Sequence, residues 1–135
     1  MYNRGIFQFD VVINIAAARK LWEANVNNPG SIPDYIINKI ELIFGRQNLD
    51  FHPQRGDILE SQSSIVMFDG FTDSEDEGLG KGMKIFFKYD KKTGRMEKIK
   101  QSSLNGVTVT FGYAGDYIYA TNENKKLFYE NMNKL

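Results

Sequence analysis

The chain has 135 residues, and its 17 basic and 17 acidic side chains give a formal net charge of zero. This length and a hydrophobic fraction of 41% suit one hydrophobic core, so we expect a single domain over residues 1–135. The balanced charge argues against a protein built mainly to bind nucleic acid, because such proteins usually carry a basic excess. The lack of cysteine excludes disulfides, thiolate zinc sites and cysteine nucleophiles.

The N-terminal residues lack a basic stretch followed by an apolar run, and no segment approaches about 18 uninterrupted apolar residues. We therefore expect neither a signal peptide nor a membrane span. The lack of cysteine also fits a reducing compartment. The composition thus favours a cytoplasmic location.

Residues 5–15 fit two different elements. Apolar and polar residues alternate there, as in a half-buried strand, with Phe7, Phe9, Val11 and Ile13 on one face. The same region could instead begin a helix capped by Asp10. The β-branched run 11–13 favours the strand, because such side chains lose rotamer freedom in a helix. Asn14 would then cap a helix through Ala16–Trp22.

A second helix is predicted between two glycines. The turn at 27–30 ends with Gly30, Ser31 is a good N-cap, and Pro33 suits a first helical turn. Apolar residues then recur at helical spacing as far as Phe44, and Gly45 supplies the stop. We expect a loop over residues 48–56.

Extended structure is predicted from Asp57 onward. The pattern indicates strands at 58–68, 83–89, 95–104, 107–113 and 117–120. They are separated by an acidic loop at 69–78, a tight turn at 90–94, an Asn105–Gly106 hairpin turn and a turn at 114–116. Thr121 is expected to cap a final short helix with Leu127, Phe128, Met132 and Leu135 on its apolar side.

The predicted fold class is therefore α+β. It has an N-terminal strand and two helices, an antiparallel β meander of about five strands, and a short C-terminal helix. This order is similar to that of the helix-grip folds, in which a curved sheet wraps a long terminal helix around a cavity. The similarity covers most of the chain and concerns element order alone. It implies an interior pocket for a small, mostly apolar molecule.

Three motifs invite a chemical interpretation, and we give each a structural one. His52 could shuttle protons, but no nucleophile elbow accompanies it, so we interpret it as a loop residue. The acidic run 73–77 partly imitates a calcium loop, but Lys84 stands where a bidentate glutamate should come. The glycines of 78–82 precede a predicted strand and not a helix, so no phosphate loop is expected. We predict no catalytic residue, metal site or cofactor.

Lysines concentrate in the segment from Lys81 to Lys100. Alternation predicts Lys84, Phe86 and Lys88 on one strand face, with Ile85, Phe87 and Tyr89 on the other. Such lysines often only protect a sheet edge from aggregation, but they could also meet an acidic partner. The predicted partner-binding residues are Lys84, Phe86, Lys88, Lys98 and Lys100.

These observations favour a non-enzymatic binding domain that engages a macromolecular partner through its sheet surface, as a small regulator or inhibitor. The expected partner is a protein. The alternative is a helix-grip-like domain with an interior pocket for a small apolar ligand, which could include an enzyme without conventional motifs. Nucleic-acid binding through the lysines is a third and weaker alternative.

Overall fold

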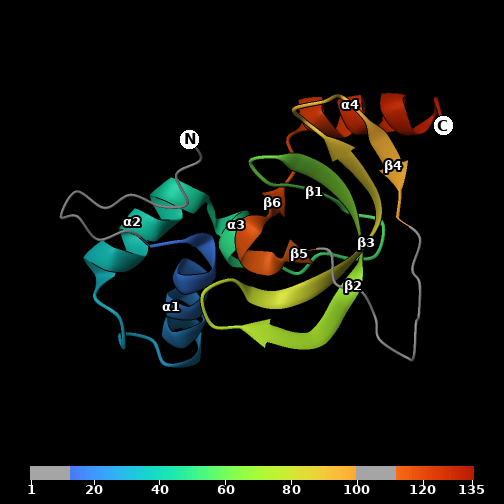
Figure 1. Cartoon of the computed structure of the whole chain (residues 1–135). Coiled ribbons are helices and arrows are strands. Elements are labelled where there is room, and N and C mark those ends of the chain that lie inside the picture. The colour runs from blue at the N-terminus through green and yellow to red at the C-terminus, as the bar shows by residue number, and fades with distance from the viewer. Residues whose placement is uncertain (1–12, 100–111) are drawn as a thin grey trace.

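The computed structural model describes residues 13–99 and 112–135 (Figure 1). Within these ranges helices accompany an antiparallel sheet, which confirms the predicted α+β class. Ile13 and Asn14 have no regular structure. The rest of the predicted N-terminal strand and the Asn105–Gly106 turn lie outside the described residues.

The first helices follow the predicted caps with one correction. Helix α1 (Ile15–Asn27) begins where Asn14 Oδ1 accepts the Ala17 N–H at 2.8 Å. Helix α2 (Asp34–Phe44) begins after Pro33, so the prediction of Ser31 as its cap is wrong. The Ser31 hydroxyl instead donates to the α1 carbonyl of Ala24 at 3.1 Å.

Helix α2 ends at a glycine, as its sequence predicts. Gly45 has a φ of 80°, a conformation that favours glycine over other residues. A single turn of helix, α3 (Arg46–Leu49), follows directly and takes up the beginning of the predicted loop.

In the described residues the sheet contains six strands. These are β1 (Ile58–Glu60), β2 (Ser64–Asp76), β3 (Gly80–Asp90), β4 (Met96–Lys98), β5 (Gly112–Tyr113) and β6 (Ile118–Tyr119). Their order is β4-β3-β2-β1-β6, and β5 pairs with β3 beside β4. All pairs are antiparallel.

The predicted continuous strand 58–68 is wrong, because a turn divides it into β1 and β2. At this turn Ser61 Oγ accepts the N–H groups of Ser63 at 3.3 Å and Ser64 at 3.2 Å. A serine side chain thus supplies the turn that glycine, proline or asparagine would signal more clearly.

The prediction of an acidic loop at 69–78 is also wrong, because most of these residues belong to β2. Strand β2 continues to Asp76, and the chain turns only at 77–79. Pairing with the lysine-bearing strand β3 accounts for this extension. Glu75 lies opposite Lys81, so opposite charges face each other across the two strands.

The sheet is strongly curled, because its two outer strands are joined by a very short connection (Figure 1). In a flat sheet, four interstrand spacings of about 4.8 Å would separate β5 from β6 by about 19 Å. The five residue steps from Tyr113 to Ile118 could reach at most about 18 Å if fully extended. Three of these residues form the compact 3-10 helix η1 (Ala114–Asp116). The edges must therefore approach each other.

Buried side chains cover both faces of this curled sheet. The concave face carries Leu59, Val66, Phe68, Met83 and Ile85, and Phe51 and Tyr117 pack with them. Ile58 and Ile65 point to the opposite, convex face, where Phe128 of helix α4 (Asn122–Met132) covers them. A third cluster joins α1, α2 and α3 to Ile118 of β6.

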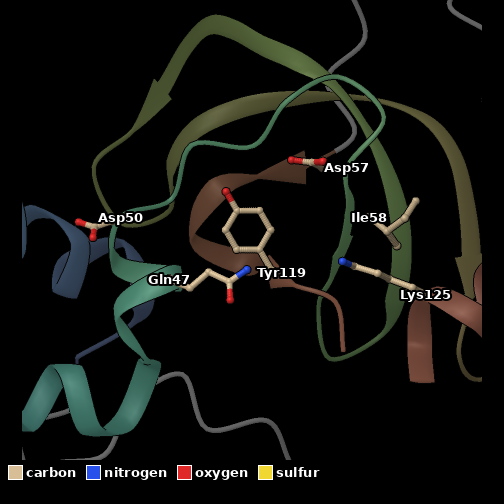
Figure 2. Close-up of a pocket in the computed structure, with 6 residues that line it drawn as sticks. All are labelled: Gln47, Asp50, Asp57, Ile58, Tyr119 and Lys125. Carbon is tan, nitrogen blue, oxygen red and sulfur yellow. The ribbon is translucent and has the colours of Figure 1, made fainter. Parts of the chain in front are cut away.

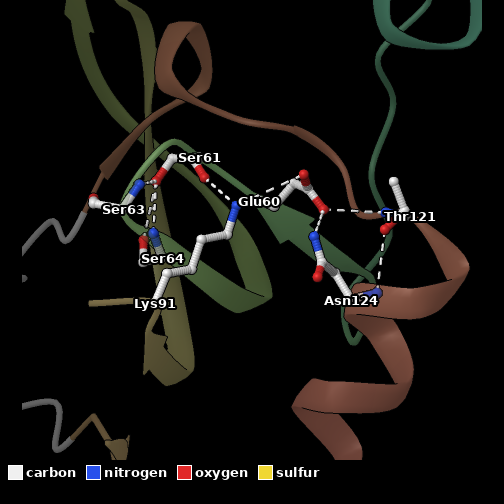
Figure 3. A network of polar contacts seen from close by, with 7 residues as sticks. All are labelled: Glu60, Ser61, Ser63, Ser64, Lys91, Thr121 and Asn124. Atoms are coloured by element: carbon white, nitrogen blue, oxygen red, sulfur yellow. Dashed lines mark hydrogen bonds and ion pairs between the residues drawn. The ribbon is translucent and has the colours of Figure 1, made fainter. Parts of the chain in front are cut away.

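Helix α4 is fastened to the sheet at its N-terminus (Figure 3). The Thr121 hydroxyl accepts the Asn124 N–H at 3.1 Å, as predicted for its cap. Glu60 of β1 accepts the Thr121 N–H at 3.1 Å and the Asn124 side-chain N–H at 2.8 Å. Lys91 lies 3.7 Å from the same carboxylate. None of the helices in the described ranges has the length and apolar composition needed to cross a membrane.

Candidate functional site

The predicted partner-binding lysines divide between the two faces of the sheet. Register shifts flank Phe68, where β2 pairs with Ile85. As a result Ile85 lies on the concave face, whereas Phe87 and Tyr89 lie on the convex face near α4. The prediction that these three share one face is wrong, because the extra residue at a bulge reverses the alternation.

The strand pairs place each lysine on a face. Lys88 lies opposite Val66, so it shares the concave face, and on its other side it faces Glu97. Lys98 lies opposite Phe87 and therefore on the convex face. Lys84 alternates with its concave neighbours Met83 and Ile85, which also places it on the convex face. Lys100 lies outside the described residues.

Phe86 does not stand free among the lysines. The Arg55 guanidinium carbon lies 4.7 Å from the centroid of the Phe86 ring. Arg55 is held in place by Asp69, whose Oδ1 lies 3.0 Å from its Nε. A cation of the same chain therefore already occupies one face of this ring.

Two of these lysines have no acidic residue as their strand partner, since Lys84 lies opposite Gly70 and Lys98 opposite Phe87. Lys98 is exposed, and Lys84 and Lys88 are half-buried. The ion pairs Arg46–Asp50, Arg55–Asp69 and Lys91–Glu60 of the described residues include none of these three lysines. Because Lys88 lies opposite Glu97, we call only Lys84 and Lys98 the free lysines.

A polar depression of about 420 Å³ lies between α3 and α4 (Figure 2). Its lining is Gln47, Asp50, Asp57, Ile58, Tyr119 and Lys125. The Tyr119 hydroxyl accepts the His52 backbone N–H at 3.1 Å, and burial raises the pKa of this phenol. Asp57 accepts the Gln54 N–H at 2.8 Å. These contacts brace the loop that precedes β1.

A larger groove of about 560 Å³ lies between α1 and the far ends of β2 and β3. It continues the concave face of the sheet at its open end, and we call it the mouth groove. Its lining is Ala16, Arg19, Lys20, Trp22, Glu23, Val26, Leu49, Asp50, Phe51, His52, Phe71, Glu75, Gly80, Lys81, Ala114 and Gly115. Neither the sequence motifs nor their spacing indicated this groove, since it joins five separate segments.

The mouth groove is lined by several charged side chains. Carboxylates and the chain's one histidine line it, but no hydroxyl or thiol nucleophile does. In the part of the chain that the structure describes, no three His, Asp or Glu side chains gather in a way that could hold a metal ion. Residues 73 and 75, from the calcium-like run, lie along β2 as part of a strand and not of a loop.

Comparison of the chain with protein-family models, with curated proteins and with solved structures found no match. The function is therefore argued from the geometry of this chain alone.

Proposed function

We propose that this chain is a cytoplasmic, non-enzymatic binding domain that engages an acidic protein through the sheet surface of β3 and β4. A small regulator or inhibitor would act in this way. The proposed binding residues are Lys84 and Lys98, because Lys88 of the predicted set lies on the other face of the sheet, opposite Glu97.

The observation that supports this proposal is the lack of ion-paired carboxylates at the free lysines. Arg55 and Lys91, by contrast, lie 3.0 Å and 3.7 Å from acidic partners within the chain. Lysines that only protect a sheet edge from aggregation can lie on either face of the sheet. Here Lys84 and Lys98 share the convex face, where a facing acidic surface could meet both. Complementary charge of this kind orients a partner and speeds its association.

The proposal is tested by reversing charge on one face at a time. We expect the double variant Lys84→Glu, Lys98→Glu to lose at least tenfold in capture of acidic proteins from a host lysate, measured by quantitative mass spectrometry. The matched control is Lys126→Glu, Lys134→Glu, which makes the same charge change at two exposed positions outside β3 and β4. Equal capture by both double variants would contradict the proposal.

A second measurement separates protein from nucleic acid. Binding of a single-stranded oligonucleotide would fall steeply with salt, because phosphate contacts release counterions. We expect no such binding by the wild-type chain at physiological salt. Strong, salt-sensitive oligonucleotide binding that the Lys84→Glu, Lys98→Glu variant loses would replace the protein partner with a nucleic acid.

A further inference from the structure

The mouth groove combines a buried apolar floor with exposed apolar walls. Trp22 and Phe51 are each 8% exposed and belong to the floor. Val26 of α1 is 59% exposed and Phe71 of β2 is 38% exposed, and both line the same groove. Large apolar side chains left in water on two facing elements mark a surface that gains free energy when it is covered.

Two polar groups of the groove floor are already hydrogen-bonded within the protein. The Trp22 indole N–H donates to Asp50 Oδ1 at 2.5 Å. The Arg19 guanidinium donates to the carbonyls of Asn48, Ala114 and Tyr117, and it lies over the Phe51 ring at 3.9 Å. A charged group placed on this floor would lose its hydration without gaining a new partner, which costs free energy.

The charged side chains of the rim are balanced. Lys20 and Lys81 face Glu23 and Glu75 around the opening, two positive charges against two negative ones. Lys20 also lies 3.5 Å from the Glu77 carbonyl oxygen, and Lys81 Nζ lies 5.9 Å from the Phe71 ring centroid. A rim of this kind gives no net attraction to an anion or to a cation.

We propose that the mouth groove binds a small, uncharged aromatic molecule. The volume of about 560 Å³ lies within the range of roughly 300–1,000 Å³ that holds such ligands. The ligand would cover Val26 and the Phe71 ring, which are the exposed apolar walls, and its lack of charge matches the bonded polar groups of the floor. This site is separate from the free lysines and does not depend on the partner proposed for them.

The test uses two probes that share one ring system. N-phenyl-1-naphthylamine is neutral, and 8-anilinonaphthalene-1-sulfonate carries an added sulfonate. We expect the neutral probe to bind with a fluorescence increase and to shift the Trp22 indole N–H resonance, which is a local reporter because the chain has one tryptophan. We expect the sulfonate to bind at least tenfold more weakly.

Matched variants locate the binding. Val26→Glu places a charge on the groove wall, and we expect it to weaken binding of the neutral probe at least tenfold. Leu42→Glu makes a comparable change at an 86% exposed position of α2, outside the groove, and should leave binding unchanged. Both positions are exposed, so both variants should fold. Equal effects of the two variants, an unshifted indole resonance or tighter binding of the sulfonate would each overturn the proposal.

Discussion

At the scale of single residues, two glycines allow the sheet edges to approach each other. A Cβ atom on Gly115 would lie 2.5 Å from the Leu79 carbonyl oxygen and 2.8 Å from Ala16 Cβ. A Cβ atom on Gly112 would lie 2.7 Å from the Tyr117 ring. The backbone and helix beside Gly115 and the buried Tyr117 ring beside Gly112 cannot move aside easily, so these positions need glycine for space and not for a special backbone conformation.

We expect Gly115→Ala to lower the free energy of unfolding by about 1–3 kcal/mol, the usual cost of overpacking. Urea denaturation followed by Trp22 fluorescence measures this loss. The control is Gly78→Ala, whose new Cβ would meet its nearest neighbour at 3.4 Å, and we expect a change below about 0.5 kcal/mol. A Gly115→Ala variant as stable as wild type would show that the contact relaxes freely.

Because of Tyr117, we expect the free energy of unfolding to fall at high pH. Its pKa is raised above 10.0 mainly by burial, and the hydrogen bond with Ser64 opposes this shift. The neutral phenol is therefore favoured in the folded state, and its contribution is complete below pH 10 and lost as pH rises through the folded pKa. We expect the unfolding free energy to fall above pH 10, and Tyr117→Phe to reduce that slope. An unchanged slope in urea titrations of the variant would exclude Tyr117 as its source.

At the scale of elements, Glu60 anchors the start of α4 to the sheet through two hydrogen bonds, and it also pairs with Lys91 (Figure 3). Glu60→Ala removes an acceptor for two N–H groups and leaves Lys91 without its carboxylate. We expect a loss of about 1–3 kcal/mol and faster hydrogen exchange in α4 than in α1. Glu130→Ala, at an exposed position of the same helix, is the control and should change neither. Uniform exchange changes across both helices would argue against a local anchor.

The elements that the sequence predicts well are those with a local signal. Asn14 and Thr121 cap helices through their own side chains, and Gly45 ends α2 with a positive φ. Such signals lie within three or four residues of the boundary that they set, so a single sequence contains them.

The failed predictions depend on pairing between distant residues. Strand β2 extends into acidic residues because β3 lies beside it, and the bulges near Phe68 move Ile85 and Phe87 to opposite faces. Residue propensities and the alternation of apolar and polar residues identify neither the partner strand nor the register of the pairing. For the same reason the sequence identified the lysines but not the faces on which they lie, and it gave no sign of the mouth groove.

At the scale of the whole molecule, Arg19 links the helices to the sheet edges. From α1 it donates to the Asn48 carbonyl of α3 and to the carbonyls of Ala114 and Tyr117 in and after η1, and it also covers Phe51. A lysine has three rotatable N–H donors on one atom and cannot reproduce this planar arrangement. The three contacts therefore require arginine.

We expect Arg19→Lys to lower the unfolding free energy on the order of 2–4 kcal/mol, because buried carbonyls lose charged donors. Thermal and urea denaturation would measure the loss. Arg46→Lys is the control, since its side chain is 74% exposed and has an ion pair of 3.6 Å, and we expect a change below about 0.5 kcal/mol. Equal losses in the two variants would show that the planar contacts of Arg19 contribute nothing specific.

The short connection between the sheet edges also has a consequence for how the chain folds. Strands β1, β2 and β3 pair with sequence neighbours, but β6 pairs with β1 across 60 residues, as in Leu59 with Tyr119. Forming such a distant contact costs loop-closure entropy, so it follows the local hairpins in time. During synthesis the edge of β1 must then stay unpaired until residues 112–135 have left the ribosome. The synthesis of residues 112–135 therefore sets how long the edge of β1 remains unpaired in the newly made protein.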